Sequence, residues 1–594
     1  MLKIQGKTDS TRIPENMVKL SPLRYSTAAT TTAELVAEQL AHFNIDPVSE
    51  FGKTITQMAH RIYECQGNVD ELWHITQDNI HQLQYKDRIA LFNAKKILSF
   101  QLAKVLDSLQ TPFRKSYQSL KSSNTTRSAR SAYSIFDNVT AIFSATPVIT
   151  RTATYTYACA EWIADAFQGK ELMLEIYSRL LNPTSIALAN HIVDLEAGPD
   201  AQDYLTWNFN SGMAAIDATL SHVLGYEDIL ITSRNIYGGA HQLIHDWYAK
   251  PSNFNVVVET YAGETAEDFL SCWHSVKARY EERLLAPEGK QKSAYLYLES
   301  PCNPHGYVLD VPAICKAAHK EGLRVILDAT VGTPFLHRPL AREDQEERPD
   351  FLIHSYTKDL SGNGTVIAGC VIGHNKDMFI PKGDPGSDQT LFRNVYYVKG
   401  AFLTADAAFE VLTGMRTLEM RMLSKCINTQ ILATFLDAHP MIKVNCNALP
   451  ENHNAPVRKK LMFLDLPAPL FTIEMTKIPL LIFQRFFDSL EPHFSHMISL
   501  GQTNTIISCP GLTTHSELND KEQREAAIYP NTIRFAMGNE NPKDLIHHFV
   551  EVAKLVMDEE IPGFSDGFLS MHKTDELIKN TYIDTHTRYI EANL

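Results

Sequence analysis

The stretch Asp350-Phe-Leu-Ile-His-Ser-Tyr-Thr-Lys358 places a short apolar run directly before two hydroxyl side chains and a lysine. The run predicts a buried strand with Ser355, Thr357 and Lys358 at its end. Ser355 and Thr357 are two residues apart, so an extended backbone points both hydroxyl groups to one side. Two hydroxyl groups beside a lysine amine can form a pocket that binds a phosphate group and a carbonyl group. Taken alone, the stretch is more often a surface loop with a solvated lysine.

A second apolar strand is predicted upstream, and it ends in a carboxylate. It reads Arg324-Val-Ile-Leu-Asp328-Ala-Thr330. An aspartate at the end of a buried strand needs a cation or several donors, because an unpaired buried charge costs free energy. A protonated pyridine nitrogen is one such cation, and the carboxylate would keep that ring electron-accepting. A helix N-cap or an ordinary salt bridge is the alternative, and the presence of Lys358 favours the first interpretation.

Two turns of small residues precede these strands. Asn210-Ser211-Gly212-Met213 opens a predicted helix whose free backbone N–H groups can bind a phosphate, and Gly212 would let it approach closely. Tyr237-Gly238-Gly239 places an aromatic ring beside a flexible turn, where it can stack on a planar ligand. Each of these stretches by itself is more often an ordinary turn or core segment.

Short β-branched runs alternate with helical patterns from about residue 142 onward. The predicted strands are residues 229–232, 255–259, 294–298, 324–327 and 351–355, and helical patterns cover 214–224 and 311–320. Near-continuous apolar strands alternating with helices predict an α/β fold with a parallel sheet covered on both faces. Ligands bind such sheets at the carboxyl ends of the strands.

The rest of the chain divides by composition. We expect an N-terminal helical region without an assigned role over residues 1–120, a linker over 121–141 that is rich in Ser, Thr and Arg, and a large domain over 142–436. A smaller α/β domain follows over 437–551, and residues 552–594 form a C-terminal extension without strong strand patterning.

Charge and hydropathy exclude several kinds of partner. The 594 residues carry a formal net charge of −14, with 44% hydrophobic and 21% charged residues, as in ordinary globular proteins. The negative charge disfavours binding to nucleic acid, which requires many Lys and Arg residues. No window approaches the roughly 18 consecutive apolar residues of a membrane span. We therefore expect a soluble protein without nucleic-acid or membrane partners.

The nine cysteines are scattered and include no CxxC pair, which argues against a zinc ribbon or a dithiol site. Scattered single cysteines are typical of reduced thiols, so we expect a cytoplasmic protein without a bound metal. The first thirty residues are rich in Ser and Thr and poor in acids, which leaves an organelle transit peptide as the alternative.

The order and spacing of eight motifs resemble the Cys/Met-metabolism family of pyridoxal-phosphate (PLP) enzymes, which are similar to cystathionine γ-synthase and have fold type I. The motifs are Tyr177-Ser-Arg179-Leu-Leu-Asn182-Pro183-Thr184, SGMAA at 211–215, YGG at 237–239, ESPCNP at 299–304, LDAT at 327–330, SYTK at 355–358, SLG at 499–501 and IRFAMG at 533–538. The resemblance covers residues 142–551 and implies a mostly parallel large domain and a smaller C-terminal α/β domain. The N-terminal helical region and the C-terminal extension lie outside it.

The resemblance also implies roles for single residues with pyridoxal 5'-phosphate as the cofactor. Lys358, Tyr237 and Asp328 are the implied catalytic residues. The implied cofactor-binding residues are Lys358 through its amine, Asp328 at the pyridine nitrogen, Tyr237 on the ring, Asn303 near the phenolic oxygen, and Ser211, Gly212, Met213, Ser355, Thr357, Tyr177 and Arg179 around the phosphate. Arg534 and Ser499 are the implied substrate-binding residues, with Arg534 gripping the substrate carboxylate.

The same resemblance implies an assembly. Tyr177 and Arg179 would reach the phosphate of a neighbouring subunit, so the site needs at least a dimer. A homotetramer built from catalytic dimers, acting on a small amino-acid substrate, is the expected form.

Some positions depart from the family pattern. After the lysine the family usually has Tyr, then Gly-His and an Asp, whereas this chain has Asp359, Gly362-Asn363 and Thr365. Before SLG, family members that handle cystathionine often have glutamate, and this chain has Ile498. Gly239 stands where methionine γ-lyases carry a cysteine.

The loop after SLG bears on the substrate. Together with Ile498, the residues Thr503, Thr505 and Thr513-Thr514-His515 resemble methionine γ-lyases and O-acylhomoserine sulfhydrylases. We expect γ-elimination or γ-replacement on a methionine-, homocysteine- or O-acylhomoserine-like substrate, that is, a carbon–sulfur lyase or transferase of the trans-sulfuration type. The alternatives are cystathionine γ-synthase or γ-lyase activity, an aminotransferase, and a catalytically retired PLP fold that acts through its N-terminal helical region.

Overall fold

The computed structural model describes residues 29–79, 84–119, 121, 123–130, 144–155, 167, 176–287, 289–380, 382, 384–512 and 527–594. The chain forms two compact units. One consists of residues 1–148, 152–178 and 381–383, and the other of residues 149–151, 179–380 and 384–594. Within the described ranges, none of the helices has the length and hydropathy that a membrane span requires.

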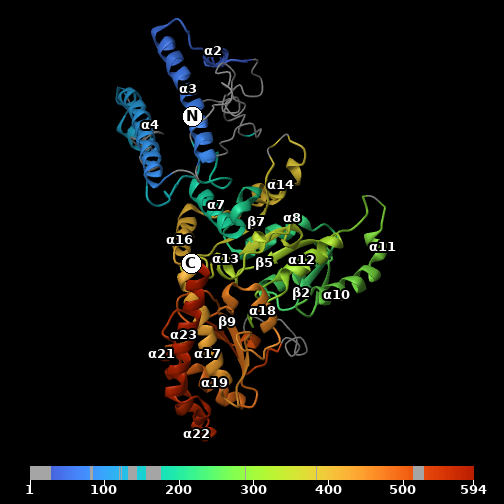
Figure 1. The fold of residues 1–594 in the computed structure, drawn as a ribbon. Helices are drawn as coiled ribbons and strands as arrows, with labels where there is room; N and C mark the ends of the chain where they lie inside the picture. Colours follow the sequence, from blue (N-terminus) through green and yellow to red (C-terminus); the bar gives the residue numbers. More distant parts are fainter. Residues whose placement is uncertain are drawn as a thin grey trace. The chain divides into compact units, whose positions relative to one another are not determined.

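The larger unit contains a seven-stranded sheet, in the order β1-β7-β6-β5-β4-β2-β3. Figure 1 labels β2, β5 and β7 of this sheet. The strands are β1 (Tyr204–Phe209), β2 (Ile229–Ser233), β3 (Val257–Tyr261), β4 (Ala294–Glu299), β5 (Arg324–Asp328), β6 (Phe351–His354) and β7 (Gly369–His374). Strands β2 to β6 pair in parallel, and β7 runs antiparallel to both β6 and β1. The predicted mostly parallel α/β sheet is confirmed, and β1 and β7 are additions that the sequence reading did not include.

Both faces of this sheet are buried, because successive side chains of a strand point to opposite faces. Leu230, Tyr297 and Ile326 pack with α8 (Gly212–Val223) on one face. Neighbouring strand residues such as Leu296 and Val325 belong to a second core. That core also contains side chains of α10 (Ala266–Arg279) and α12 (Val311–Lys320). Burial on both faces explains why the strands read as continuous apolar runs.

A second, five-stranded sheet forms the small domain, in the order β10-β11-β12-β9-β8. Its strands are β8 (Lys443–Asn445), β9 (Leu470–Glu474), β10 (Ser495–His496), β11 (Ile506–Ser508) and β12 (Thr532–Ala536). Its helices include α17 (Leu418–Asp437), α19 (Leu480–Asp488) and α21 (Pro542–Val552). Helix α17 lies almost wholly before the predicted boundary at residue 437, yet it packs against β8 and β9 of this sheet.

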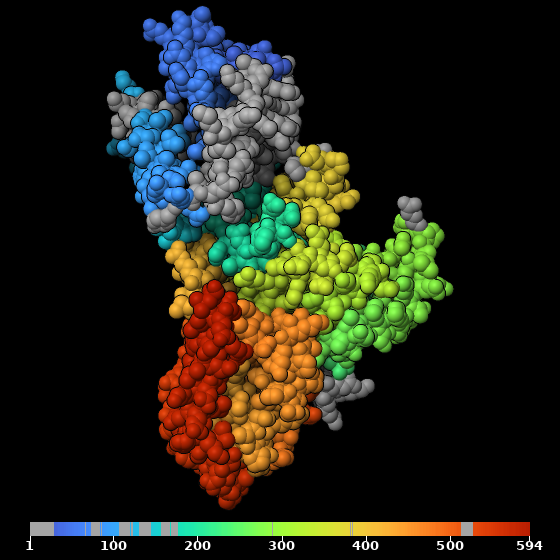
Figure 2. Space-filling view, in the orientation of Figure 1, coloured from blue at the N-terminus to red at the C-terminus, as the bar shows by residue number. Residues whose placement is uncertain are grey.

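The C-terminal extension is largely one helix, α23 (Met571–Asn593), which packs on α17 and α21. Figure 2 shows it in dark red on the surface beside the small domain. Arg588 Nη1 donates a hydrogen bond to the Leu464 carbonyl at 2.6 Å, so the extension is attached to the small domain by polar contacts as well.

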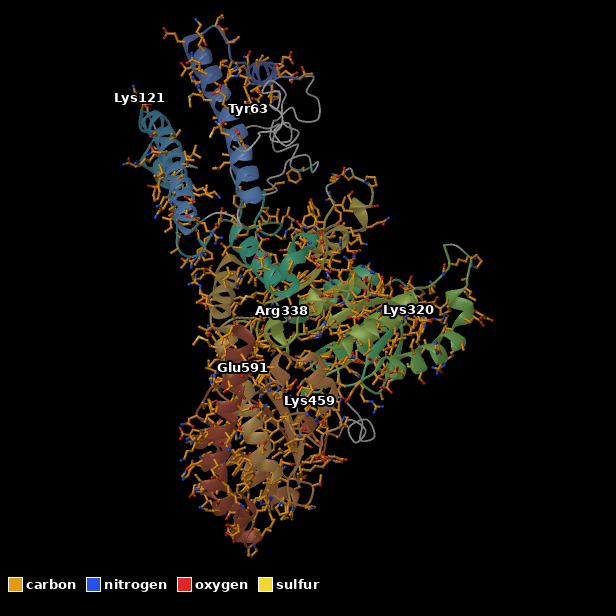
Figure 3. All side chains as sticks on the ribbon, viewed as in Figure 1. Tyr63, Lys121, Lys320, Arg338, Lys459 and Glu591 are labelled. Carbon is orange, nitrogen blue, oxygen red and sulfur yellow. The ribbon has the colours of Figure 1, made fainter. Side chains whose placement is uncertain are left out.

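The N-terminal unit contains α2 (Thr32–His42), α3 (Glu50–Asn79), α4 (Tyr85–Ser119) and α5 (Asn124–Arg130). Helices α2 and α3 are joined by a hydrogen bond of 2.8 Å from Gln39 Nε2 to the hydroxyl of Tyr63, which Figure 3 labels. The α4 side chains Ile97, Leu98 and Leu102 are more than half exposed, so no packed core forms around them among the described residues. Helix α5 occupies part of the predicted linker, whose residues 131–141 lie outside the described part of the chain.

Candidate active site

The predicted site residues of the large domain gather at the carboxyl edge of its sheet. Asp328 ends β5, directly opposite Glu299 at the end of β4 and Ile353 near the end of β6. Just beyond β6, the backbone N–H of Ser355 donates to Thr330 Oγ1 at 2.8 Å. The strand register therefore places the carboxylate of Asp328 beside the segment that carries Ser355 and Lys358.

Lys358 lies in the turn after β6 and meets the small domain. Its Nζ donates a hydrogen bond to Ser499 Oγ at 3.2 Å. Gly501 has φ +86°, and a Cβ placed there would lie only 2.7 Å from the Cα of Lys358, so the Ser499–Gly501 loop lies against the backbone of the lysine. Burial and the nearby Arg534 cation lower the pKa of Lys358, while Asp359 and Asp328 oppose that shift.

Arg534 lies on β12 and is only 2% exposed. Its Nη1 donates to Asn303 Oδ1 at 3.1 Å and its Nη2 donates to the Ser499 carbonyl at 2.7 Å. Its Nε has no partner, and no carboxylate among the described residues forms an ion pair with it. Burial lowers the pKa of Arg534 to about 10. This guanidinium is a buried cation whose neutralising anion must come from elsewhere.

Two buried carboxylates lie side by side at the strand ends. Asp328 Oδ1 accepts a hydrogen bond from the Thr330 backbone N–H at 3.0 Å. Glu299 accepts from the backbone N–H groups of Tyr237 at 2.6 Å and Asn303 at 3.1 Å. Burial raises the pKa of both groups, and the charge of Asp328 raises that of Glu299 further.

The sequence reading missed Glu299. Glu299 ends β4, the strand next to β5, and is the first residue of the ESPCNP motif. Like Asp328, it is a carboxylate at the end of an apolar strand, and this shared position could have identified it from the sequence. Its two hydrogen bonds hold the turns of Tyr237 and Asn303, so it positions two of the predicted cofactor-binding residues.

The predicted phosphate-binding turn opens α8 beside the end of β6. Ser211 caps the helix, because its Oγ accepts from the Ala214 N–H at 3.1 Å. A Cβ at Gly212 would lie 2.7 Å from the Cβ of Ser355, so only glycine allows this approach. Ser211, Gly212 and Ser355 are thus brought together at a helix N-terminus, where an anion is favoured.

Thr357 is held differently from the other predicted phosphate ligands. Its hydroxyl donates to the Ala368 carbonyl at 3.2 Å and accepts from the Ala368 N–H at 3.0 Å. The single hydroxyl proton of Thr357 is therefore used in the hydrogen bond to the Ala368 carbonyl. Thr357 can donate to a phosphate only if this hydrogen bond breaks.

Tyr237 and Met213 meet around Gly239. A Cβ at Gly239 would lie 2.6 Å from the Tyr237 ring and 3.1 Å from the Met213 sulfur. A cysteine at this position would therefore displace one of these two side chains. Tyr237 is 40% exposed, which leaves part of its surface open to a ligand.

Tyr177 and Arg179 fall on different sides of the division between the two units. Tyr177 pairs with Thr154 in a short antiparallel bridge within the N-terminal unit. Arg179 belongs to the larger unit, where its Nη1 donates to the Tyr397 carbonyl at 2.7 Å. Their role at the phosphate of a neighbouring subunit stays a prediction.

The loop after Ser499 contains the residues that depart from the family pattern. Ile498 is largely exposed. Thr505 is buried and donates to Glu540 Oε2 at 2.8 Å, so its hydroxyl serves the small domain and not a substrate. Residues 513–515 lie outside the described part of the chain.

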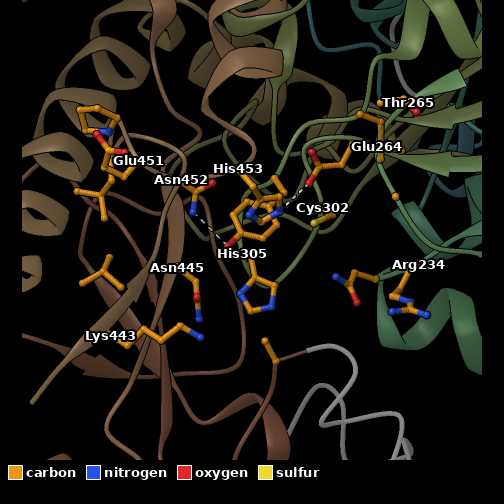
Figure 4. A pocket seen from close by; sticks show the side chains of 18 of the residues that line it. Arg234, Glu264, Thr265, Cys302, His305, Lys443, Asn445, Glu451, Asn452 and His453 are labelled. Carbon is orange, nitrogen blue, oxygen red and sulfur yellow. Dashed lines mark hydrogen bonds and ion pairs between the residues drawn. The ribbon is translucent and has the colours of Figure 1, made fainter. Parts of the chain in front are cut away.

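A separate cavity of about 800 Å³ lies at the ends of β2, β3 and β4, next to the small domain (Figure 4). His305, Lys443 and Arg234 line it, and His453 Nε2 lies 3.0 Å from Glu264 Oε1 at its wall. None of the predicted site residues lines it. Across the described ranges, no group of three His, Cys, Asp or Glu side chains is placed to hold a metal ion.

The sequence model of the Cys/Met metabolism PLP-dependent enzyme family matches residues 136–552. The chain belongs to this family. L-Methionine gamma-lyase of Porphyromonas gingivalis is 30% identical over 405 residues, which are 68% of this chain and 90% of that protein. O-Acetyl-L-homoserine sulfhydrylase of Leptospira meyeri is 26% identical over 434 residues, which are 68% of this chain and 91% of that protein.

A solved structure agrees with the family assignment. A putative O-acetylhomoserine (thiol)-lyase from Campylobacter jejuni, with N'-pyridoxyl-lysine-5'-monophosphate, is similar with a TM-score of 0.58 and 26% identity, covering 69% of this chain and 96% of that chain. The expected fold type I is confirmed, and so is PLP as the cofactor of this enzyme.

The site residues fit the cofactor of the Cys/Met metabolism PLP-dependent family. The missing side chain of Gly212 leaves the N-terminus of α8 close to Ser355, which suits a phosphate group. Asp328 is a buried carboxylate without an ion pair among the described residues, and a protonated ring nitrogen would supply the cation it lacks.

Proposed function

We propose that this PLP-dependent enzyme catalyses γ-elimination or γ-replacement on a methionine-, homocysteine- or O-acylhomoserine-like amino acid. The observation that carries the proposal is Arg534, a buried guanidinium without an anionic partner among the described residues. It is held next to Ser499 and therefore near Lys358. The methionine lyase and sulfhydrylase activities named for the relatives support this choice of substrates.

Arg534 is the proposed carboxylate-binding group. Asn303 and the Ser499 carbonyl each accept from one of its terminal nitrogens, which fixes the plane of the guanidinium. The Nε of Arg534, which has no partner among the described residues, can donate a hydrogen bond to a carboxylate. The fixed plane of the guanidinium then orients that carboxylate. The amino acid is thereby held with its Cα on the side of Lys358.

Lys358 is the proposed base at Cα and the residue that links the protein to the cofactor. Its lowered pKa increases the share of neutral amine, the form that accepts a proton. The hydrogen bond to Ser499 Oγ positions the amine. Tyr237 is the proposed residue for further proton transfers, because its partly exposed ring lies at the same strand ends.

When bound, PLP withdraws electrons from the substrate carbon atoms. Asp328 would hold the pyridine nitrogen in its charged form, and Asn303 would lie near the phenolic oxygen. The phosphate would be held by Ser211, Gly212, Met213, Ser355 and, once its bond to Ala368 opens, Thr357. Glu299 keeps Tyr237 and Asn303 in place through their backbone N–H groups.

The proposed assembly is a cytoplasmic homotetramer built from catalytic dimers. The Tyr177-Ser-Arg179 motif supports it, because in the family these residues reach a neighbouring subunit's phosphate. The assembly and the location are inferred from this resemblance and from the scattered cysteines.

A substrate panel tests the proposed reaction. The purified protein is incubated with homoserine esters, homocysteine, methionine, cysteine and cystathionine, and 2-oxo acid, ammonia and thiol are measured. Release of 2-oxo acid with ammonia from methionine or homocysteine supports elimination, and thiol incorporation into a homoserine ester supports replacement. Preference for cystathionine would indicate the alternative activity. A 2-oxo acid without ammonia would indicate an aminotransferase, and no turnover with bound cofactor would indicate a retired enzyme.

A further inference from the structure

The residue after Lys358 forms a buried ion pair. Asp359 Oδ1 lies 2.7 Å from Lys425 Nζ, and the two side chains are 2% and 0% exposed. The family usually has a tyrosine directly after the lysine, so this charged pair is a feature of the present chain. It joins the turn that carries Lys358 to α17.

Arg421 holds the backbone of the same turn. Its Nη1 donates to the Asp359 carbonyl at 2.8 Å and its Nη2 donates to the Gly414 carbonyl at 2.9 Å. Gly362 has φ +71°, and a Cβ there would lie 2.0 Å from Arg421 Nη1, so guanidinium and turn are in close contact. Arg421 and Lys425 are four residues apart and share one face of α17. That face therefore binds both the backbone and the side chain of Asp359.

The side of the Lys358 turn that faces away from α17 lies against the Ser499–Gly501 loop. A Cβ at Gly501 would lie 2.4 Å from the Asp359 nitrogen and 2.7 Å from the Lys358 Cα. The Lys358–Asp359 peptide thus lies between α17 and the loop that supplies Ser499. A displacement of Asp359 would move the lysine relative to its hydrogen-bond partner.

Stability alone is a weak explanation for such a pair. Removing two charges from water costs free energy that their attraction only partly returns, so apolar side chains of similar volume often serve equally well. Among the described residues, the charged groups that act on Lys358 are Asp359, Asp328 and Arg534. Those that contact Asp359 are Lys425 and Arg421. Asp359 is therefore placed to act on the amine of Lys358.

We propose that Asp359 and Lys425 form a positioning pair for Lys358, which fixes the turn of the lysine and sets the electrostatic field at its amine. The inference rests on the proposed role of Lys358. The carboxylate of Asp359 favours the protonated amine, and Lys425 limits that effect by partly neutralising the carboxylate.

The test measures the titration of Lys358 in the full-length chain after removal of the cofactor. Reductive methylation is carried out over a pH series, and the rate at Lys358 is followed by mass spectrometry. Asp359→Asn should lower the midpoint by about one pH unit, the scale for loss of a nearby opposite charge. Asp359→Asn with Lys425→Met should lower it by less, because no uncompensated cation remains. Asp344→Asn, which breaks an exposed pair with Lys316 of the same 2.7 Å length, should leave it unchanged.

The double variant decides the question. Asp359→Asn alone leaves Lys425 buried without its partner, so poor folding of that variant is the expected loss of the pair. A folded double variant with the wild-type midpoint would overturn the proposal. A double variant that fails to fold would also overturn it, because the pair would then serve stability. The role of Lys358 is tested separately, by borohydride reduction of the protein with bound cofactor. If the reduced cofactor were found on another lysine, the role of Lys358 would be refuted, independently of the titration midpoint.

Discussion

Lys358 Nζ lies 3.2 Å from Ser499 Oγ, and the carbonyl of the same serine accepts a hydrogen bond from Arg534 Nη2 at 2.7 Å. One residue of the small domain thus contacts both the proposed base and the proposed carboxylate-binding group. The distance between the Lys358 amine and the Arg534 guanidinium therefore depends on the position of the Ser499–Gly501 loop.

Lys358→Ala should abolish turnover and leave the fold intact, because no large core cavity is created. The loss of the proposed base alone corresponds to about 10²–10⁴-fold in rate. In the wild-type protein, borohydride should remove the visible absorbance band and fix the cofactor on the peptide that contains Lys358. Mapping of the label to a different lysine would refute the assignment.

Arg534→Lys should weaken substrate use by about 1.5–3 kcal/mol, roughly ten- to 150-fold in kcat/KM, because a planar two-point donor becomes a single ammonium group. Cofactor absorbance should not change. Arg458→Lys is the matched control, since Arg458 is also buried in the small domain but donates to the Asn447 carbonyl. An equal loss of kcat/KM in both variants would show that Arg534 acts on the fold and not on the substrate.

Arg179→Ala should weaken cofactor retention, if the arginine reaches the phosphate of a neighbouring subunit. Mixing Arg179→Ala with Lys358→Ala protein should restore some activity, because a mixed dimer contains one site with both residues intact. Activity is measured after subunit exchange has been demonstrated by mass spectrometry. Exchange without any recovery would contradict a shared site.

Limited proteolysis should cleave first within residues 121–134, since Ser-rich segments with little to bury are preferred sites. Arg127 and Arg130 are the expected trypsin positions, because the seven-residue helix α5 that contains them is too short to be stable by itself. The C-terminal fragment should keep its cofactor, which its absorbance reports after gel filtration. Immediate release of the cofactor on cleavage would place the N-terminal region within the active assembly.

His337 should make the protein sensitive to acid. Burial lowers its pKa to about 3, and neither ring nitrogen has a partner among the described residues. The folded protein disfavours the protonated imidazole of His337. The stabilising contribution of the neutral imidazole is therefore present above the unfolded pKa and is lost as the pH falls from about 6.5 toward 3. His337→Phe should reduce the slope of unfolding free energy against pH by up to about 1.4 kcal/mol per unit in this range. Denaturation curves of both proteins, taken over the same pH range, measure this slope.

The strands and the position of Asp328 could be predicted because their signals are local. A run of apolar residues that ends in a carboxylate is visible without its neighbours, and β5 ends at Asp328. The antiparallel strand β7 was not predicted from the sequence. Its partner β1 is remote in sequence, and its partner β6 runs in the opposite direction. Glu299 was missed for a related reason, because only the register shows that it lies opposite Asp328.

By itself, the sequence determined the fold class, the family, the cofactor and the residue types needed for its chemistry, since each rests on motifs of a few neighbouring residues. Tertiary structure alone decided which side chains meet. Arg534 and Asn303 are 231 residues apart, and Lys425 and Asp359 are 66 apart. No local pattern encodes such pairs, because they result from the packing of the small domain and α17 against the strand ends.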